Sequence, residues 1–155
     1  MLVNLGSGRK IDAGALNVDA KAWPGVGLVC DLEQGWPFKD GSLDTVKADN
    51  VFEHLKDPVH TMQELYRVMK LGAQVAIVVP STNGMGAFQD PTHKSFWNIN
   101  SFQYYTDDQF ISYLGFEGKF NVVELREAMF ARGNACHIPF VRAILEKIPW
   151  QSTSR

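Results

Sequence analysis

Two glycines and a carboxylate near the start of the chain are arranged in a way that suits a nucleotide-containing ligand. The apolar residues 2–5 lead directly into Gly6 and Gly8, and Asp19 ends the next short apolar stretch. Glycine permits a sharp turn and a close approach of a ligand to the main chain. A carboxylate at the end of the following strand can accept hydrogen bonds from both hydroxyls of a ribose. The pattern therefore favours an adenosine-containing cofactor, with an ordinary glycine turn as the alternative for the glycines alone.

Polar residues also end two further apolar stretches. Asp31 follows residues 28–30, and Asn50 follows residues 43–48. In an open parallel sheet, ligands bind beyond the carboxyl ends of the strands. We therefore expect these two side chains to converge with Asp19 and with the glycine turn on one ligand site.

The apolar stretches predict five strands followed by a closing hairpin. A short apolar run before a glycine turn suits a buried parallel strand, and the β-branched run 73–79 is expected to be the most buried strand. The hairpin is expected to turn at residues 132–134, and a helix over 140–147 remains an open alternative. The predicted strands are residues 2–5, 17–19, 28–31, 43–48, 73–79, 119–125 and about 135–145.

Three helices are predicted after the fourth strand. In the first, Asp57 is a good N-cap, Pro58 fits the first helical position and Gly72 is a natural terminator. A short helix is expected over residues 99–105, and a capping box at Thr106 predicts another, which ends at Gly115 and points Phe110, Ile111 and Leu114 inward. The inward face of the first helix is expected to comprise Val59, Met62, Leu65, Tyr66 and Met69.

Residues 80–97 show no periodicity. A loop of this length in a compact domain is usually functional or disordered. This loop carries Asp90, His93, Phe96 and Trp97, so we expect it to cover the site.

Composition indicates a globular protein. The 155 residues are 45% hydrophobic and 21% charged, which is enough to bury a core. The formal net charge of -2, with Lys and Arg scattered, gives no reason to expect a nucleic-acid partner. No apolar run approaches the length that spans a bilayer, and no signal-peptide pattern opens the chain. Cys30 and Cys136 are too few for a disulfide framework, so we expect reduced thiols in a cytoplasmic protein.

Strands that alternate with helices or loops, followed by a hairpin, predict an α/β fold. We expect a Rossmann-like, doubly wound, mostly parallel sheet of about seven strands with a C-terminal antiparallel hairpin, in a single domain over residues 1–155. The first crossover, residues 9–15, is shorter than parallel strands usually need, so any helix there is a single turn at most.

Taken in order, the motifs of this sequence resemble those of class I S-adenosylmethionine-dependent methyltransferases. The resemblance covers most of the first hundred residues, and the ordered set is more specific than any one motif. The motifs that carry it are Leu5-Gly6-Ser7-Gly8, Asn17-Val18-Asp19, Asp31-Leu32, Trp36-Pro37-Phe38, Asn50-Val51-Phe52-Glu53-His54-Leu55, Glu64-Leu65-Tyr66-Arg67-Val68-Met69-Lys70 and Asp90-Pro91-Thr92-His93.

The resemblance implies a site for S-adenosylmethionine. It places the backbone around Gly6 and Gly8 at the methionine part of the cofactor, and Asp19 at the ribose hydroxyls. It places Asp31 at the adenine and Asn50 near the sulfonium. The full set of cofactor-binding residues that it implies is Leu5, Gly6, Ser7, Gly8, Asp19, Asp31, Leu32, Asn50 and Val51.

The chain departs from the family pattern near its start. Lys10 stands where the family has the third glycine of G-x-G-x-G, and the first crossover is short. The sequence also begins at the first strand, without the upstream helix that often covers the cofactor. These departures leave open a cofactor-binding subunit that supports a partner chain.

S-adenosylmethionine already carries an electrophilic methyl group, so the protein mainly has to align donor and acceptor and exclude water. A general base is needed only for a protonated acceptor. His93 and His54 are the candidates, because an ordinary imidazole titrates near neutrality. A structural loop role for His93 and a capping or core role for His54 are the alternatives. Asp90 is expected to orient His93 or to stabilise a turn, and Glu53 to pair or cap locally.

A metal site formed by Asp90, His93 and His54 has suitable ligand types. No close ligand spacing in the sequence supports it, so we expect no metal.

The leading hypothesis is methyl transfer from S-adenosylmethionine to a small-molecule or sugar-like acceptor. One alternative is a non-catalytic, S-adenosylmethionine-binding subunit that acts in a homodimer or with a partner chain. An NAD-dependent oxidoreductase is less favoured, because Ile11 stands where G-x-G-x-x-G requires its last glycine.

Overall fold

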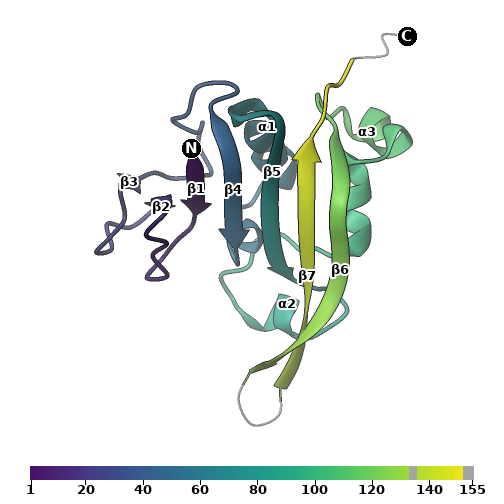
Figure 1. Cartoon of the computed structure of the whole chain (residues 1–155). Helices are drawn as coiled ribbons and strands as arrows, with labels where there is room; N and C mark the ends of the chain where they lie inside the picture. Colours follow the sequence, from purple (N-terminus) through teal and green to yellow (C-terminus); the bar gives the residue numbers. More distant parts are fainter. Residues whose placement is uncertain (133–135, 152–155) are drawn as a thin grey trace.

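The fold is built on one β-sheet (Figure 1). The computed structural model describes residues 1–132 and 136–151. Its sheet has seven strands in the order β3-β2-β1-β4-β5-β7-β6. The first five strands pair in parallel, and β7 is antiparallel to both of its neighbours, β5 and β6. The strands are β1 (Leu2–Leu5), β2 (Leu16–Asp19), β3 (Leu28–Val29), β4 (Leu43–Asp49), β5 (Met69–Pro80), β6 (Phe120–Arg132) and β7 (Cys136–Lys147).

The predicted α/β sheet of about seven strands with a C-terminal antiparallel hairpin is confirmed. A helix over residues 140–147 is excluded, because this segment pairs along its length with β5 and β6. Of the predicted hairpin turn at residues 132–134, residues 133 and 134 lie outside the described residues.

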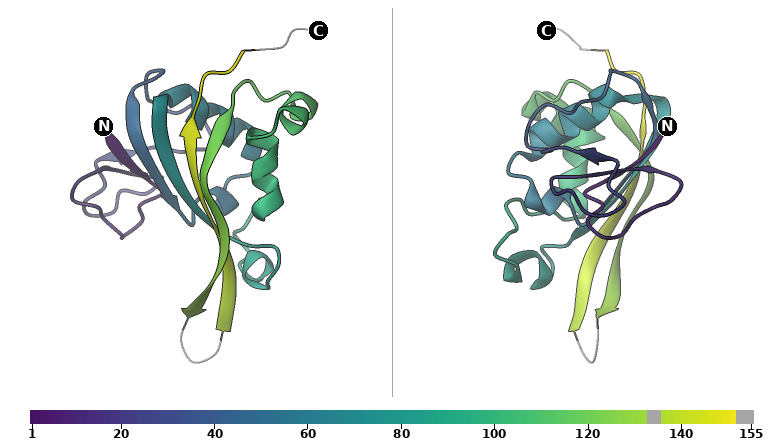
Figure 2. Two further views of the ribbon diagram at one scale, coloured as in Figure 1. Left: turned by 45° about the vertical axis from the view of Figure 1, so that its right-hand side comes forward. Right: turned by 90° about the vertical axis from the view of Figure 1, so that its left-hand side faces the viewer.

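Helices cover one face of the sheet, as the two views of Figure 2 show. Among the described residues, no helix is long and apolar enough to cross a lipid bilayer. The helical segments are η1 (Phe52–His54), α1 (Pro58–Val68), α2 (Gly86–Gln89), η2 (Ile99–Tyr105) and α3 (Asp108–Leu114).

Helix α1 begins where the sequence predicts. The Asp57 carboxylate accepts a hydrogen bond from the backbone N–H of His60 at 2.9 Å, and Pro58 occupies the first helical position. Met62 and Leu65 are fully buried against the sheet. The N-cap and the apolar face together account for the helix, since its burial supplies most of the stability of so short a segment.

The predicted end of α1 is wrong. The helix ends at Val68, and Met69 already pairs with Leu43 as the first residue of β5. The backbone N–H of Ser42 donates to the carbonyl oxygen of Val68 at 2.8 Å, which satisfies a terminal carbonyl without a glycine cap. Gly72 has a φ of 77° but lies within β5.

The start of α3 also differs from the prediction. Asp107, not Thr106, is the N-cap, and its carboxylate accepts from the Gln109 backbone N–H at 2.9 Å. Thr106 instead hydrogen-bonds back into η2. The helix ends at Gly115, whose φ of 72° fits the predicted glycine terminator. Of the predicted inward face, Ile111 is buried, whereas Phe110 and Leu114 are half-buried.

The opposite face of the sheet is open, and along β4 it is polar. In β4, Val46 and Ala48 are buried under the helices, while Thr45 and Lys47 are exposed on the other side. The short crossover, residues 6–15, forms turns rather than a helix, as predicted, and so adds no cover to this side. Parallel sheets usually bury both faces, so the polar side chains here are what makes exposure tolerable.

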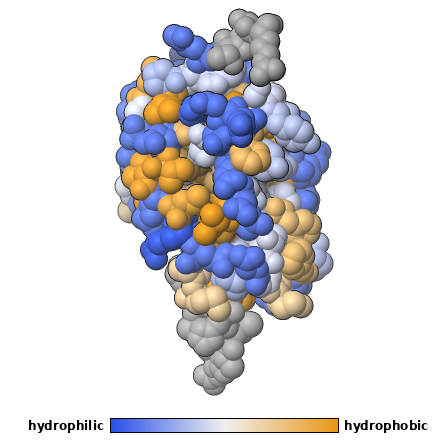
Figure 3. Space-filling view, turned by 90° about the vertical axis from the view of Figure 1, so that its right-hand side faces the viewer, coloured by the Kyte–Doolittle hydropathy of each residue, from blue (hydrophilic) through white to orange (hydrophobic). Residues whose placement is uncertain are grey.

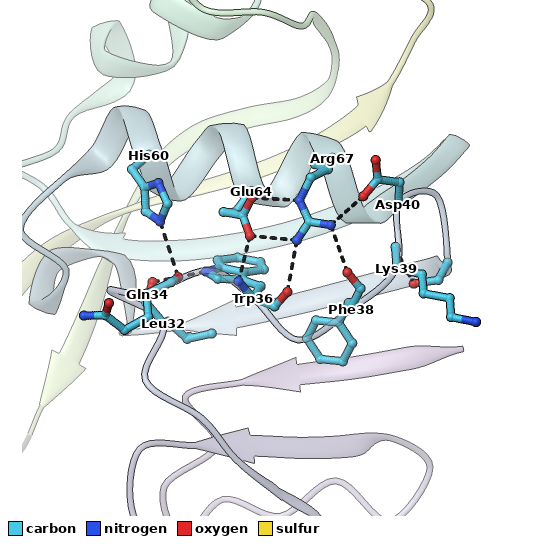
Figure 4. Close-up of polar contacts among 10 residues, drawn as sticks. Leu32, Gln34, Trp36, Phe38, Lys39, Asp40, His60, Glu64 and Arg67 are labelled. Carbon is cyan, nitrogen blue, oxygen red and sulfur yellow. Dashed lines mark hydrogen bonds and ion pairs between the residues drawn. The ribbon is translucent and has the colours of Figure 1, made fainter.

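Arg67 of α1 anchors the loop between β3 and β4 (Figure 4). Its guanidinium donates to the carbonyl oxygens of Trp36 at 3.0 Å and Phe38 at 2.9 Å, and to the carboxylates of Glu64 and Asp40. Glu64 also accepts from the Trp36 backbone N–H at 2.7 Å. These contacts fix the loop that follows the tip of β3.

Replacing Arg67 tests this anchor. We expect Arg67→Ala to lower the free energy of unfolding by about 2–3 kcal/mol, because the Glu64 carboxylate and the carbonyls of Trp36 and Phe38 all lose their guanidinium donor. Arg67→Lys should recover only part of the loss, since an ammonium lacks the planar fork. Urea denaturation measures both. Arg126→Ala, which removes an exposed pair with Glu124, is the control and should cost less than about 0.5 kcal/mol. Equal losses in both alanine variants would contradict the anchor.

Candidate functional site

The turn after β1 contains two glycines, Gly6 and Gly8, with different structural roles. Gly6 has a φ of 56° and Gly8 a φ of 52°, in the left-handed region that favours glycine. A Cβ on Gly6 would lie 2.4 Å from a methyl group of Val51, so Gly6 allows close packing against the end of β4. A Cβ on Gly8 would meet nothing within 4 Å. Gly6 is therefore required by packing, and Gly8 faces open space that a ligand can use.

Ser7 lies between these glycines. Its side chain is buried, and its hydroxyl has no hydrogen-bond partner among the described residues. The neighbouring Leu5 is fully buried in the core, as is most of Val51, so these two can offer a ligand little beyond their backbone. Buried polar groups usually have a partner, so this hydroxyl marks the turn as a position that a ligand or a bound water completes.

Asp19 ends β2 beside the glycine turn. Its Oδ2 accepts from the Gly8 backbone N–H at 2.8 Å, and its Oδ1 accepts from the Lys21 backbone N–H at 2.9 Å. Each carboxylate oxygen has a second lone pair, so both can still accept from hydroxyl groups. The two backbone contacts fix the orientation of the carboxylate in advance.

The tip of β3 lies next to the tip of β2. The Cys30 backbone N–H donates to the carbonyl oxygen of Asp19 at 2.9 Å. Asp31 is exposed, and its Oδ1 accepts from the Glu33 backbone N–H at 3.0 Å. Leu32 is buried, with 5% of its surface exposed. The predicted residues at β1, β2 and β3 therefore occupy adjoining strand tips.

Asn50 follows β4 with a φ of 55°, the one positive φ of a non-glycine residue among those described. Its backbone N–H donates to Val78 of β5 at 2.9 Å, and its side-chain amide donates to Asp49 at 2.6 Å. Asparagine tolerates this conformation better than most residues, at a small cost in stability. Such strain is concentrated at functional sites, so it supports a role for this position.

A cleft of about 620 Å³ opens beside these tips, at the carboxyl ends of β4 and β5. Its walls include Lys10 after β1, Asn50 after β4, His54 of η1, His93 of the loop before η2, and Arg142 of β7. The structure thus brings both predicted catalytic histidines together with Asn50. The other predicted cofactor residues lie on the strand tips rather than in the described lining of this cleft.

The two histidines lie against each other and are oriented by main-chain carbonyls. Their ring centroids are 5.0 Å apart at an angle of 71°. His54 Nδ1 is 3.2 Å from the carbonyl oxygen of Thr92, and His93 Nδ1 is 2.8 Å from that of Ala87. The Thr92 hydroxyl is also 3.1 Å from His54 Nδ1, but it donates its own proton to Asp90 at 2.7 Å. Since a carbonyl oxygen only accepts, in the neutral rings each Nδ1 carries the proton and each Nε2 offers a lone pair.

Asp90 stabilises the turn before His93. Its Oδ1 accepts from the backbone N–H and the hydroxyl of Thr92 at 2.8 and 2.7 Å. Its Oδ2 is 3.9 Å from His93 Nε2, which is too long for a hydrogen bond. Of the two predicted roles, the turn is the one with direct contacts.

The sequence predicts a local pairing or capping role for Glu53, but among the described residues its side chain neither caps η1 nor forms an ion pair. The residue is 2% exposed, and its Oε2 has no hydrogen-bond partner among the described residues. Burial raises the pKa of this carboxyl to about 7; its own backbone N–H opposes the shift, and the negative charges of Asp49 and Asp90 add to it. The signal in the sequence was a glutamate directly between Phe52 and His54, in a segment that becomes core.

The loop 80–97 combines two roles. Gln89, Asp90 and His93 line the cleft, as expected of a covering segment. Trp97, in contrast, is 2% exposed and packs in the core. The role of Trp97 is therefore structural.

The titration of Glu53 should appear in the stability of the protein. Folding raises its pKa from 4.5 to about 7, so the folded state is not penalised below pH 4.5 and is progressively penalised as the pH rises through 7. Glu53→Gln removes this charge. With a chelator present, we expect the variant to gain about 3 kcal/mol relative to wild type between pH 4.5 and pH 8. Urea denaturation at both pH values measures the gain, and an unchanged difference would contradict it.

A family model described as a methyltransferase domain matches residues 8–77. No curated protein matches the chain at significance. Solved structures of the same fold include one described as a SAM-dependent methyltransferase from Archaeoglobus fulgidus, which is 19% identical with a TM-score of 0.62 over 94% of this chain and 85% of that one.

Two other structures share the fold at low identity. One is the Burkholderia thailandensis 1,6-didemethyltoxoflavin-N1-methyltransferase with bound S-adenosylhomocysteine, at 12% identity and a TM-score of 0.64 over 96% of this chain and 71% of that one. The other is a complex between the Haloferax volcanii Trm112 methyltransferase activator and a methyltransferase. It is 16% identical with a TM-score of 0.66, and the alignment covers 96% of this chain and 82% of that one. The methyltransferase-domain match and the shared fold confirm the resemblance: in its motifs and in its architecture, this chain is similar to the class I S-adenosylmethionine-dependent methyltransferases.

Proposed function

We propose that this chain, as one domain over residues 1–155, binds S-adenosylmethionine and transfers its methyl group to a small-molecule or sugar-like acceptor. The observation that carries the proposal is the adjacency of two half-sites. The glycine turn and Asp19 lie on neighbouring strand tips, and the cleft with Asn50 and both histidines opens directly beside them.

S-adenosylmethionine is the cofactor that the family match and the shared fold support. The residues present fit an adenosyl ligand. Gly8 leaves open space, Ser7 has an unpartnered hydroxyl, and Asp19 holds two oxygens ready for ribose hydroxyls. We assign the adenine end to Asp31 and Leu32, and the sulfonium end to the strained backbone at Asn50.

The acceptor would occupy the cleft. Its volume of about 620 Å³ is within the range of small-molecule sites, and its walls mix apolar and charged side chains such as Lys10 and Arg142. When bound, the cofactor supplies an electrophilic methyl group. The chain positions the acceptor, excludes water and takes up its proton where it has one. His93 Nε2 and His54 Nε2 are the basic atoms assigned to that step.

A cofactor-binding subunit that supports a partner is the second candidate. Met85, Phe88 and Phe96 are all more than half exposed. The rings of Phe88 and Phe96 stack, with their centroids 5.2 Å apart. Hydrophobic side chains also form patches among hydrophilic ones on the face that carries α3 and η2 (Figure 3). Exposed apolar surface of this kind favours association with another chain, and one structure of the same fold comes from a complex with an activator.

Cofactor binding is tested by thermal unfolding with S-adenosylmethionine and S-adenosylhomocysteine. We expect the midpoint to rise with ligand concentration, because the ligand binds the folded state. Asp19→Asn should weaken binding about 10–100-fold through the loss of a charged acceptor. Asp108→Asn, on the exposed start of α3, is the matched control and should bind like wild type. Millimolar ligand without any shift, or equal shifts with NADH, would refute the assignment.

Methyl transfer is tested with cofactor labelled in the methyl group and a panel of hydroxyl- and amine-bearing small molecules. If the acceptor must lose a proton, His93→Gln should lower kcat by about 10²–10⁴-fold. Cofactor affinity should stay unchanged. His60→Gln, outside the cleft, is the control. Transfer that appears only when a second protein is added would favour the subunit alternative.

A further inference from the structure

Three side chains at the floor of the cleft have the composition of a metal site. Glu53, His54 and His93 each offer one ligand atom, and these atoms all lie within 4.8 Å of one another. Glu53 and His54 are consecutive in η1, whereas His93 comes from the loop before η2. The cluster therefore forms only in the folded protein, which is why its spacing is invisible in the sequence.

The histidines are already oriented as metal ligands. Each donates its Nδ1–H to a main-chain carbonyl, His54 to Thr92 and His93 to Ala87. Metal-binding histidines almost always donate their other ring N–H in this way, because the contact fixes the tautomer and makes the ligating nitrogen more basic. In that tautomer each Nε2 carries a lone pair that can ligate a metal ion.

Glu53 supplies a second, independent observation. Its side chain is buried, with 2% of the residue exposed, and its Oε2 has no hydrogen-bond partner and no ion pair among the described residues. The backbone fixes the residue in place, since its carbonyl oxygen accepts from the N–H groups of Lys94 at 2.7 Å and Ser95 at 3.1 Å. A buried carboxylate oxygen without a partner is costly when the group is charged, and a bound cation would remove that cost.

We propose that Glu53, His54 and His93 bind one divalent transition-metal ion, with an open coordination position toward the cleft. Two imidazoles and one carboxylate form the ligand set of catalytic zinc sites that keep a fourth position open. Ligand atoms on a tetrahedral zinc ion are about 3.4 Å apart, so the cluster closes with side-chain movements of about 1 Å. Magnesium and calcium prefer oxygen ligands and fit this set poorly.

Nearby charges favour a cation at this position. The carboxylate of Asp90 is 3.9 Å from His93 Nε2, at the rim of the cluster. The cations that line the cleft are paired with carboxylates, Lys10 with Asp49 at 3.2 Å and Arg142 with Glu124 at 3.2 Å. Lys94 pairs with Glu33 at 2.8 Å. Each of these positive charges has a carboxylate of its own, which limits its repulsion of a bound cation.

The proposal extends the chemistry of the cleft. An acceptor oxygen in the open position would lose its proton more easily, because a bound metal ion lowers the pKa of its ligand. This step rests on the proposed methyl transfer, whereas metal binding itself does not. A metal ion and a proton compete for the same Nε2 atoms, so with the metal bound neither histidine takes up the proton, which passes from the metal-bound oxygen to solvent water.

The test uses the full chain after treatment with a chelator and its removal, and without cofactor. Zn²⁺ is titrated by calorimetry, and Co²⁺ is followed by its visible absorption. We expect one equivalent of Zn²⁺ to bind with a micromolar or tighter dissociation constant and to raise the unfolding midpoint. Mg²⁺ should produce no comparable shift. A bound Co²⁺ ion with few ligands should show the strong visible absorption of a four- or five-coordinate site.

Variants identify the ligands. Glu53→Gln, His54→Asn and His93→Asn should each weaken Zn²⁺ binding at least tenfold, and His60→Asn should bind as wild type does. Glu53→Gln keeps the size of the side chain, so it decides the question even if a histidine variant unfolds. Binding that is absent in wild type, or equal in wild type and Glu53→Gln, would overturn the site. A cofactor-induced shift that persists in that case would leave the proposed function standing.

Discussion

Parallel pairing of β1 with β2 and β4 is the constraint on which the site depends. The register places Leu5 beside Val18 and Ala48, so the three strands end at nearly the same level of the sheet. Continuing the pairing, Ala48 lies beside Ile77 of β5. Because all these strands point the same way, the residues that follow them gather at one edge. A slip of one residue would send the hydrophobic side chains to the open face and disperse the edge.

The covered and open faces of the sheet have separate consequences. Burial of α1 and of the aromatic cluster around Trp97 against one face supplies the hydrophobic stability. The other face carries ion pairs instead, such as that of Lys47 with Asp12. Exposed pairs of this kind contribute little to stability, so they serve solubility more than folding. The crossover that would have covered this face is the same short segment that forms the glycine turn.

The sequence allowed the strand tips to be predicted because glycine, aspartate and asparagine mark local backbone geometry. Gly8 and Asn50 both have the left-handed φ that such residues tolerate, and Asp57 caps α1 as its type suggests. The predicted end of α1 was wrong because Met69 pairs with Leu43 of β4, and local sequence propensity carries no information about such a long-range contact. Glu53 was misjudged for the same reason. Its burial results from the packing of distant segments around η1.

The groups that weaken this fold are concentrated where the ligands would bind. Asn50 holds a strained backbone, whereas Ser7 buries a hydroxyl and Glu53 buries one carboxylate oxygen that have no partner within the described part of the chain. All three residues lie beside the same strand tips. In the helix anchor around Arg67, by contrast, the polar groups are paired. Unsatisfied groups cost free energy in the empty protein, and a ligand that satisfies them recovers it on binding. The free energy that these unsatisfied groups cost the unliganded protein therefore contributes to the affinity of this edge of the sheet for its ligands.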